Sequence, residues 1–450
     1  MRTSDARDRL QTGIPWQESI PAHWKPMRLK DAVEGCSNGI WGDEPKGDAN
    51  DTPVIRVADF DRLKRKTLPH QTVRSVPFDQ RSPRELHPGD LLIEKSGGGE
   101  LQPVGMVVEF EGETGSVCSN FVARMRPREF AHGRFLTFLH AHLYDRSLTK
   151  LSIKQSTGIQ NLDSGAYLAE RCFLPPTVEQ IAIASYLDAE TVRIDGLIEA
   201  KRKLLDSLVE LKSARITEIL TGAADNLVPT GDVWIPRIPR DWTLKRLKHL
   251  GQVRSGLAKG KKHDASTETL ELPYMRVANV QDGHIDLSNV ATLEVAADDV
   301  ERYSLAVGDV LMNEGGDYDK LGRGAVWEGK ISPCLHQNHV FAVRLDDVTW
   351  APWISALTRT AYAKFYFMNN SKQSTNLASI SQTNVKEWPV VLPPEDVRDQ
   401  LLEQLTAELK RADDLIVHVE LELEALAELR AATITDAVLG RIDVRDYMKK

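Results

Sequence analysis

Residues Thr177 to Gly222 read TVEQIAIASYLDAETVRIDGLIEAKRKLLDSLVELKSARITEILTG, and this stretch decides the architecture of the chain. It follows a Leu-Pro-Pro run and contains no proline. Its apolar side chains recur at helical spacing over a length that no strand reaches, which predicts one long helix. The apolar positions are Ile181, Ala184, Leu187, Ile194, Leu197, Leu204, Leu208 and Leu211.

A second stretch of the same kind occupies the C-terminus, from Leu392-Pro393-Pro394 to Leu439-Gly440. Its apolar seam consists of Leu415, Ile416, Val419, Leu423, Leu426 and Leu429. Each seam is too long for one globular domain to cover, so the two helices are expected to cover each other as an antiparallel coiled coil. A helical hairpin that dimerises the protein or fills a core is equally compatible with the periodicity.

The two helices belong to an internal repeat with an offset of about 218 residues. The matching segments include Thr12-Gly13 and Thr230-Gly231, Arg28-Leu29-Lys30 and Arg246-Leu247-Lys248, Arg56-Val57-Ala58 and Arg276-Val277-Ala278, and Gln155-Ser156-Thr157 and Gln373-Ser374-Thr375. Two tandem copies therefore cover nearly the whole chain, each a domain followed by a long helix.

The first part of each copy reads as short strands broken by Gly and Pro, with a few short helices near Phe135–Tyr144 and Trp353–Phe365. This pattern predicts a mixed α/β (α+β) fold with two domains related by a pseudo-twofold axis and separated by the long helices. The expected boundaries are 1–176 and 225–394 for the domains, and 177–224 and 395–450 for the helices. About 25 paired residues at about 1.5 Å each would span about 38 Å, close to one turn of duplex DNA.

The net charge of −8 is concentrated in the two helical segments. Residues 177–222 hold 6 basic and 8 acidic side chains, and residues 395–450 hold 8 and 14, which leaves 43 of each sign elsewhere. Balanced domains can still carry basic faces, so the overall charge does not exclude DNA binding. The four cysteines are scattered, and neither a membrane span nor a signal peptide is evident, so a cytoplasmic protein without a membrane partner is expected.

Catalytic patterns are weak. Ser96-Gly97-Gly98-Gly99 lacks the GxxxxGK[ST] context of a phosphate-binding loop. Asp90 with Glu94-Lys95 faintly resembles a metal-dependent nuclease, but adjacent residues on a strand point to opposite faces. His336 and His339 have no acidic or cysteine cluster nearby to complete a metal site. A non-catalytic protein that binds no metal is therefore expected.

The polar loops favour recognition instead. The segments QNH (337–339), KQST (154–157 and 372–375) and NEGGDYDKLGRG (313–324) supply groups that hydrogen-bond base edges or neutralise phosphates. A single loop of this kind is more often only solvated; matching positions in two copies favour a shared role.

Several of these segments, in order, carry a family resemblance. They are IPAHWKPMRLK (20–30) and IPRDWTLKRLK (238–248), GDVLMNEGGDYDKLGRG (308–324), HQNHVFAVR (336–344), both KQST segments, LPP before each helix, and the endings ITEILTG (216–222) and ITDAVLGRIDVR (434–445). Across essentially the whole chain, the sequence resembles the specificity subunit of type I restriction-modification enzymes. In copy two the family's helix opening departs from the pattern, because Val397 and Arg398 stand where copy one has Glu179 and Gln180.

The resemblance implies that each domain is a target recognition domain reading half of a bipartite, asymmetric site in double-stranded DNA, with the helices setting the spacer. It also implies two modification (methyltransferase) subunits, which bring S-adenosylmethionine, and restriction subunits with ATP and Mg²⁺; no cofactor is expected in this chain. Two other functions stay open. One is an equivalent subunit of a methyltransferase-only or type II assembly, and the other is a repeat scaffold for protein partners.

Candidate DNA-binding residues are loop positions, because recognition domains differ in what they read. They are Lys95, Ser96, Gln102, Asn120, Lys154, Gln155 and Thr157 in copy one, and Asn313, Lys320, Arg323, Gln337, Asn338, His339, Lys372, Gln373 and Thr375 in copy two. Asn120 and Asn338 recur and are equally suited to capping turns. Residues that differ between copies, such as Lys320, Arg323 and His339, are the better candidates for specificity, and Lys154 and Lys372 for phosphate contacts.

Overall fold

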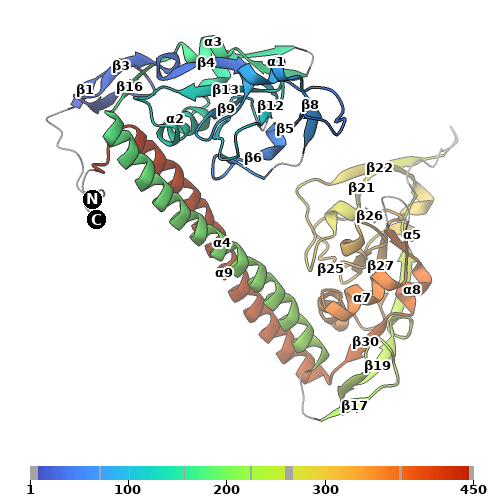
Figure 1. The fold of residues 1–450 in the computed structure, drawn as a ribbon. Helices are drawn as coiled ribbons and strands as arrows, with labels where there is room; N and C mark the ends of the chain where they lie inside the picture. The colour runs from blue at the N-terminus through green and yellow to red at the C-terminus, as the bar shows by residue number, and fades with distance from the viewer. Residues whose placement is uncertain are drawn as a thin grey trace. The chain divides into compact units, whose positions relative to one another are not determined.

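Two long helices link two compact units of the chain. The computed structural model describes residues 9–69, 72–100, 102–156, 158–222, 226–258, 267–373 and 378–444. The first unit comprises Met1–Lys201 and Glu422–Lys450, and the second comprises Arg202–Leu421. Helices α4 (Thr177–Thr221) and α9 (Glu395–Val438) each contribute part of their length to both units (Figure 1). The predicted mixed α/β fold with two long helices is confirmed.

The described residues of the first unit form short strands and three short α-helices before α4. Its largest sheet has the order β4-β13-β9-β11-β7-β6, and the smaller sheets are β12-β5-β8, β10-β15-β14, β16-β3 and β1-β2. The strands are β1 (Arg9–Gln11), β2 (Ser19–Pro21), β3 (Lys25–Arg28), β4 (Val33–Asn38), β5 (Asp51–Ile55), β6 (Phe60–Asp61), β7 (Lys66–Thr67), β8 (Val73–Ser75), β9 (Leu91–Glu94), β10 (Ser96–Gly97), β11 (Val107–Glu109), β12 (Val117–Cys118), β13 (Val122–Pro127), β14 (Ile153–Ser156), β15 (Ile159–Leu162) and β16 (Arg171–Leu174). The helices are α1 (Phe78–Arg81), α2 (Gly133–Asp145) and α3 (Ser164–Leu168).

The second unit repeats this arrangement. Its largest sheet has the order β20-β27-β23-β25, and the smaller sheets are β22-β21-β26, β24-β29-β28, β19-β30 and β17-β18. The strands are β17 (Leu227–Pro229), β18 (Arg237–Pro239), β19 (Thr243–Arg246), β20 (Gly251–Ser255), β21 (Thr269–Met275), β22 (Ala291–Ala296), β23 (Val310–Asn313), β24 (Gly315–Gly316), β25 (Gly324–Val326), β26 (Leu335–His336), β27 (Val340–Leu345), β28 (Ser371–Gln373), β29 (Ala378–Ile380) and β30 (Pro389–Leu392). The helices are α5 (Val300–Tyr303), α6 (Ala351–Leu357), α7 (Ala361–Asn369) and α8 (Gln382–Lys386).

The predicted helix near Phe135–Tyr144 corresponds to α2. The helical stretch predicted near Trp353–Phe365 is present and consists of parts of two short helices, α6 and α7. The break has a local cause, because the Thr360 hydroxyl accepts a hydrogen bond from the Ala363 N–H and so caps the start of α7.

A buried ion pair recurs at the same place in the largest sheet of each unit. Asp90, just before β9, is 2% exposed and accepts two hydrogen bonds of 2.8 Å from Arg126 on β13. Asp309, just before β23, is 1% exposed and accepts bonds of 2.8 and 2.7 Å from Arg344 on β27. Two-pronged pairing of this kind satisfies a carboxylate that burial would otherwise destabilise. Asp90 therefore has a structural role, which weakens the nuclease interpretation further.

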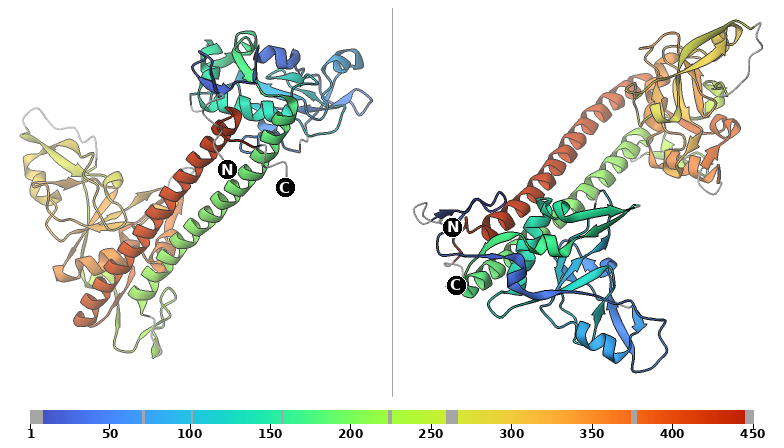
Figure 2. Two further views of the ribbon diagram at one scale, coloured as in Figure 1. Left: turned by 90° about the vertical axis from the view of Figure 1, so that its left-hand side faces the viewer. Right: turned by 90° about the horizontal axis from the view of Figure 1, so that it is seen from above.

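The helices α4 and α9 pair in opposite directions. In the first unit Asp195 binds Arg430 at 2.7 Å, and Lys201 binds Glu422 at 2.5 Å. In the second unit Lys212 pairs with Asp413. Partner numbers rise along α4 and fall along α9, as an antiparallel pair requires, and Figure 2 shows the two helices side by side in two further views. The predicted antiparallel coiled coil is confirmed.

The paired helices cover only part of the predicted seam. Leu187 and Ile194 are fully buried, whereas Leu197 is 42% exposed. Leu211 is 57% exposed, and Leu415 is 53% exposed. Two helices contact each other along a narrow stripe, so a wider apolar stripe remains partly uncovered unless another layer packs on it.

The last turn of each long helix belongs to a domain core. Ile434 and Val438 of α9 are 3% and 0% exposed and lie in the same cluster as Trp24 of the first unit. Ile216 and Leu220 of α4 have the equivalent place in the second unit. Each unit is therefore completed by the helix that closes the other copy of the repeat.

A glycine ends each of these helices in the left-handed conformation. Gly222 has a φ of +79°, and a Cβ there would lie 2.5 Å from Cγ of Pro239. Gly440 has a φ of +59°, and its Cβ would lie 2.6 Å from Cδ of Pro21. Both the backbone angle and the close approach of proline require glycine at these positions.

The helix opening that departs from the family pattern has different contacts in the two copies. Gln180 is 1% exposed; its amide accepts a hydrogen bond from the His132 N–H at 2.8 Å and donates to the Phe130 carbonyl at 3.0 Å. At the equivalent position Arg398 is 6% exposed and stacks over the Trp350 ring, 4.6 Å from its centroid. A cation–π contact in copy two thus takes the place of the amide bridge in copy one.

Candidate nucleic-acid interface

Strand β9 of the first unit ends at a cavity of about 470 Å³, here termed the Glu94 cavity. Its wall is formed by Trp41, the segment Arg56–Ala58, Glu94, the corner Ser96–Gly98 and the loop Ser119–Phe121. These segments are distant in the sequence and are brought together at one end of the largest sheet.

Backbone hydrogen bonds hold the cavity wall in place. The Lys95 N–H donates to the Phe121 carbonyl at 2.7 Å, and the Glu94 N–H donates to the Met106 carbonyl at 2.8 Å. The corner turns at Gly98, whose φ is +62° and whose Cβ, if present, would lie 2.8 Å from the Gln102 carbonyl oxygen. Glycine is therefore required for this corner.

Two polar side chains of the wall are buried, and one oxygen atom of each lacks a hydrogen bond from the described part of the chain. Glu94 and Ser119 are each 2% exposed, and neither Oε2 of Glu94 nor Oγ of Ser119 has a hydrogen-bond partner. The nearest cation to this carboxylate oxygen is Arg62, at 3.7 Å. Burial raises the pKa of Glu94 to about 7, and the charge of Arg62 only partly opposes that rise.

Three predicted residues of copy one lie at this cavity or beside it. Ser96 and Asn120 line it, and Lys95 donates a hydrogen bond of 2.6 Å to Oδ1 of Asn38. Gln102 is exposed in the following loop.

A small sheet joins the cavity to the predicted phosphate contact Lys154. Strand β15 pairs with β10 on one side and β14 on the other, so Ser96 and Lys154 both lie opposite Asn161. The Lys154 side chain is 78% exposed and binds Asp163 at 2.7 Å. Gln155 lies on β14, but its side chain and the whole of Thr157 are outside the described residues. The structure thus brings the two polar segments of copy one together.

Copy two builds the same small sheet from β24, β29 and β28, where Gly315 and Lys372 both lie opposite Ser379. Lys372 and Gln373 are exposed on β28, and Thr375 is outside the described residues.

The predicted specificity residues of copy two have acidic or amide partners. Arg323 donates a hydrogen bond of 2.9 Å to Oε1 of Gln281, and Lys320 pairs with Asp317. The His339 side chain is 54% exposed, with Nδ1 at 3.2 Å from Oε2 of Glu314.

The other predicted residues of copy two are less exposed. Asn313 is 1% exposed, and its amide donates to the Val280 carbonyl at 3.2 Å, which places it inside the domain. Gln337 and Asn338 are half-buried, and the Asn338 N–H donates to the Leu257 carbonyl at 3.0 Å.

The wall of the Glu94 cavity contains residues that the sequence reasoning missed, chiefly Trp41, Arg56 and Phe121. One signal was present, because Arg56-Val57-Ala58 is one of the segments that recur in copy two. Trp41 and Phe121 gave no such signal, because the equivalent residues of copy two are Ala258 and His339.

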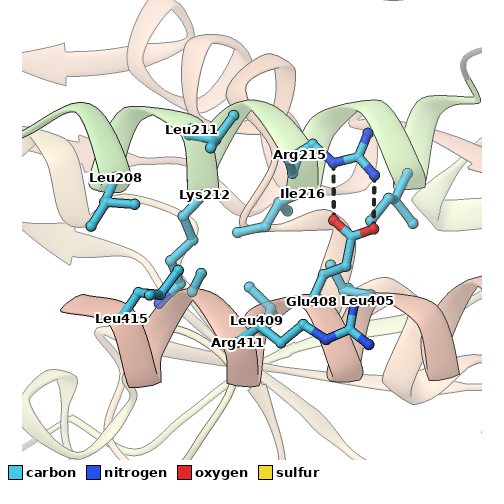
Figure 3. Close-up of a pocket in the computed structure, with 12 residues that line it drawn as sticks. Leu208, Leu211, Lys212, Arg215, Ile216, Leu405, Glu408, Leu409, Arg411 and Leu415 are labelled. Carbon is cyan, nitrogen blue, oxygen red and sulfur yellow. Dashed lines mark hydrogen bonds and ion pairs between the residues drawn. The ribbon is translucent and has the colours of Figure 1, made fainter. Parts of the chain in front are cut away.

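The paired helices of the second unit offer a separate apolar surface. A cavity of about 240 Å³ lies between α4 and α9 and is lined by leucines and isoleucines, including Leu208, Leu211 and Leu415 (Figure 3). At its edge, Arg215 forms two hydrogen bonds to Glu408, of 2.9 and 2.7 Å. Exposed leucines beside an ion pair are typical of a surface that binds another helix.

The described residues contain no group of three or more His, Cys, Asp or Glu side chains suited to hold a metal ion. Across the same ranges, none of the helices combines the length and the apolar character that crossing a membrane requires.

The sequence matches no protein-family model. Over 368 residues it is 22% identical to the type I restriction enzyme EcoKI specificity subunit of Escherichia coli, a match that covers 80% of this chain and 76% of that protein. It is 20% identical over 366 residues to the StySPI specificity subunit of Salmonella potsdam, with the same coverage. A putative MjaX specificity subunit of Methanocaldococcus jannaschii is 28% identical over 195 residues, but this match spans 43% of the chain and 44% of that protein.

Solved structures share the fold. A chain from a study of complex assembly and conformational transition of the type I R-M system has a TM-score of 0.70 at 17% identity, covering 94% of this chain and 99% of that one. The HsdS subunit from Thermoanaerobacter tengcongensis has a TM-score of 0.55 at 16% identity, covering 94% and 98%.

The buried carboxyl of Glu94 predicts a pH-dependent gain in stability for Glu94→Gln. Because its folded pKa of about 7 lies above the unfolded value of 4.5, folding takes up a proton in this interval, and stability falls as pH rises through it. Two neighbouring groups interact electrostatically with the Glu94 carboxyl, namely the charged Arg62 and the titratable Tyr144. Glutamine removes the effect, so the variant should gain about 3 kcal/mol over wild type between pH 4 and pH 8. Thermal unfolding midpoints across this range measure the gain.

Glu111→Gln is the matched control, because the Glu111 side chain is 49% exposed and binds Lys66 at the surface. The difference in thermal unfolding midpoint between Glu111→Gln and wild type should change little over the same pH interval. If the thermal unfolding midpoints of wild type and Glu94→Gln changed in parallel with pH, the raised pKa of Glu94 would be contradicted.

Proposed function

We propose that this chain, a relative of the specificity subunits of type I restriction enzymes, is the DNA-recognition subunit of such a system. Each unit would read one half of a bipartite, asymmetric site in double-stranded DNA. The chain itself would carry out no catalysis. S-adenosylmethionine would enter with two modification subunits, and ATP and Mg²⁺ with restriction subunits.

One observation carries this proposal beyond the likeness to relatives. The same loops and the same three-stranded sheet recur in both units, with Lys154 and Lys372 at equivalent places opposite Asn161 and Ser379. The side chains opposite these lysines differ, because Asn161 of the first unit is replaced by Ser379 in the second. Two domains that recognise different half-sites are expected to share a lysine and to differ in the side chains near it. Phosphate contacts are common to all DNA sequences, whereas base contacts are not.

The first prediction from this proposal concerns the lysines. In the complex with modification subunits, Lys154→Gln and Lys372→Gln should each weaken binding to all duplexes alike. Each should also lower the salt dependence of binding, by about 1 in the slope of log K against log salt, because one phosphate contact is lost. Fluorescence anisotropy with labelled duplexes over a salt series measures both effects.

Lys330→Gln is the matched control, because Lys330 is also exposed and ion-paired, to Glu328 at 2.6 Å, but lies outside the small sheet. Arg323→Gln provides the contrast, since loss of a base contact should relax preference at one position by about 1–3 kcal/mol. If the affinity of the wild-type complex for duplex DNA did not change with salt, the proposed DNA recognition would be contradicted.

The second prediction concerns the helices as a ruler. Lys201 and Glu422 pair at the last positions of α4 and α9 that belong to the first unit, so seven residues inserted after Lys201 and seven before Glu422 preserve the pairing on both sides. The added rise of about 10.5 Å should lengthen the recognised spacer by about 3 base pairs. Methylome sequencing of cells with the intact system measures the spacer.

An insertion in α4 alone is the control, because it shifts the register of one helix against the other and should abolish methylation. An unchanged spacer in the double insertion would contradict the ruler role and leave DNA recognition standing.

The third prediction concerns the modification subunits, which we place on the apolar surface of the paired helices. Leu211 lines the cavity of Figure 3 and is 57% exposed, so Leu211→Glu would set a carboxylate in a partner interface. We expect loss of co-purification with modification subunits and an unchanged thermal midpoint. Val233→Glu is the control, because Val233 is 88% exposed and lies outside the helices. Co-purification that survives Leu211→Glu would contradict this docking surface.

A further inference from the structure

The Glu94 cavity leaves polar atoms unsatisfied inside the first unit. Oε2 of Glu94 and Oγ of Ser119 are buried, and no group of the described residues hydrogen-bonds them. A buried polar group without a partner costs about 1–3 kcal/mol. Two such groups on one cavity wall indicate a site shaped for hydrogen-bonding groups from outside the chain.

The cavity also has aromatic walls. Trp41 and Phe121 both line it, and Phe121 is 48% exposed. The Arg74 guanidinium lies 4.4 Å from the centroid of the Trp41 ring. Aromatic side chains in such a position stack on flat rings, and stacking of a base contributes about 1–3 kcal/mol.

The charges around the cavity narrow the class of ligand. Arg56 lines it with a side chain that is 44% exposed, and Arg62 approaches Glu94. The Arg62 guanidinium lies 3.7 Å from the buried Glu94 carboxylate, and this charge disfavours a cationic ligand such as an arginine side chain from a partner protein. A neutral ring joined to a phosphate suits both the arginines and the aromatic walls.

We propose that the Glu94 cavity binds a nucleobase lying outside the duplex stack, with Trp41 and Phe121 against the ring and the Glu94 carboxylate accepting its hydrogen bonds. The inference rests on the proposed function, because the base would come from the DNA that the first unit reads. A carboxylate accepts two hydrogen bonds side by side, and guanine presents an adjacent ring N–H and amino group on its Watson–Crick edge. In a duplex that edge is already paired, and Glu94 is too deeply buried to reach a groove, so the base must leave the stack.

The second unit lacks the chemistry of this site. Asn313 stands in place of Glu94, Ala258 in place of Trp41 and His339 in place of Phe121. The carboxylate and both aromatic rings are thus absent, so nucleobase binding is expected at the first unit alone among the described parts of the two units.

The test uses the full chain and the four 5′-mononucleotides, with binding followed by saturation-transfer NMR and calorimetry. GMP should bind more tightly than AMP, CMP or TMP. Glu94→Gln and Trp41→Ala should each lower its affinity by about tenfold or more, which corresponds to about 1.4 kcal/mol. Glu111→Gln is the control and should bind GMP as wild type does. Circular dichroism and thermal midpoints establish that each variant is folded.

Three outcomes would overturn the proposal. The first is that no mononucleotide binds, and the second is that folded Glu94→Gln and Trp41→Ala bind GMP as wild type does. The third is that N-acetyl-arginine amide binds in a Glu94-dependent manner while mononucleotides do not, which would assign the cavity to a basic side chain. Mononucleotide binding does not depend on duplex recognition. If GMP does not bind but the duplex is recognised, only the nucleobase-binding proposal is refuted. If GMP binds but the duplex is not recognised, only the proposed function is refuted.

Discussion

The antiparallel pairing of α4 and α9 carries the end of each long helix into a domain core. Each helix ends inside a domain core, with Val438 of α9 in the first unit and Leu220 of α4 in the second. The N-terminal domain is therefore completed by the last helix of the chain, so neither copy of the repeat makes a finished core by itself. Gly440 and Gly222 end these helices against prolines, and a side chain at either position would push the helix end out of its core.

The same pairing leaves leucines uncovered. Two helices bury one narrow stripe each, and Leu211 and Leu415 lie at the edge of that stripe. A globular domain tolerates few exposed apolar patches without a partner. The helices thus pair with each other along one stripe and leave apolar side chains such as Leu211 exposed beside it.

Duplication with divergence explains the two units. The elements that hold the fold are repeated, such as the Asp90–Arg126 and Asp309–Arg344 pairs, because burial of a carboxylate demands the same partner in both copies. The residues at the ends of β9 and β23 differ between the copies, with Glu94 in the first and Asn313 in the second. The ion pairs that stabilise each sheet are thus kept in both units, whereas the strand-end residues differ.

The two long helices, the mixed α/β class and the internal repeat follow from the sequence alone, whereas the antiparallel pairing of the helices was one of several alternatives until the ion pairs between them were seen. Helical periodicity and an internal repeat are patterns in the order of the residues, so they can be recognised without a structure. Polar loop residues such as Ser96 and Asn120 were also predicted from the sequence, and both line the Glu94 cavity. The three-dimensional structure was needed to show that Trp41, Glu94 and Phe121 share one wall, and that Asn313 is buried while Leu211 is exposed. The burial and the neighbours of these side chains depend on which strands and helices pack together. Contacts between residues far apart in the chain produce no periodic pattern in the sequence.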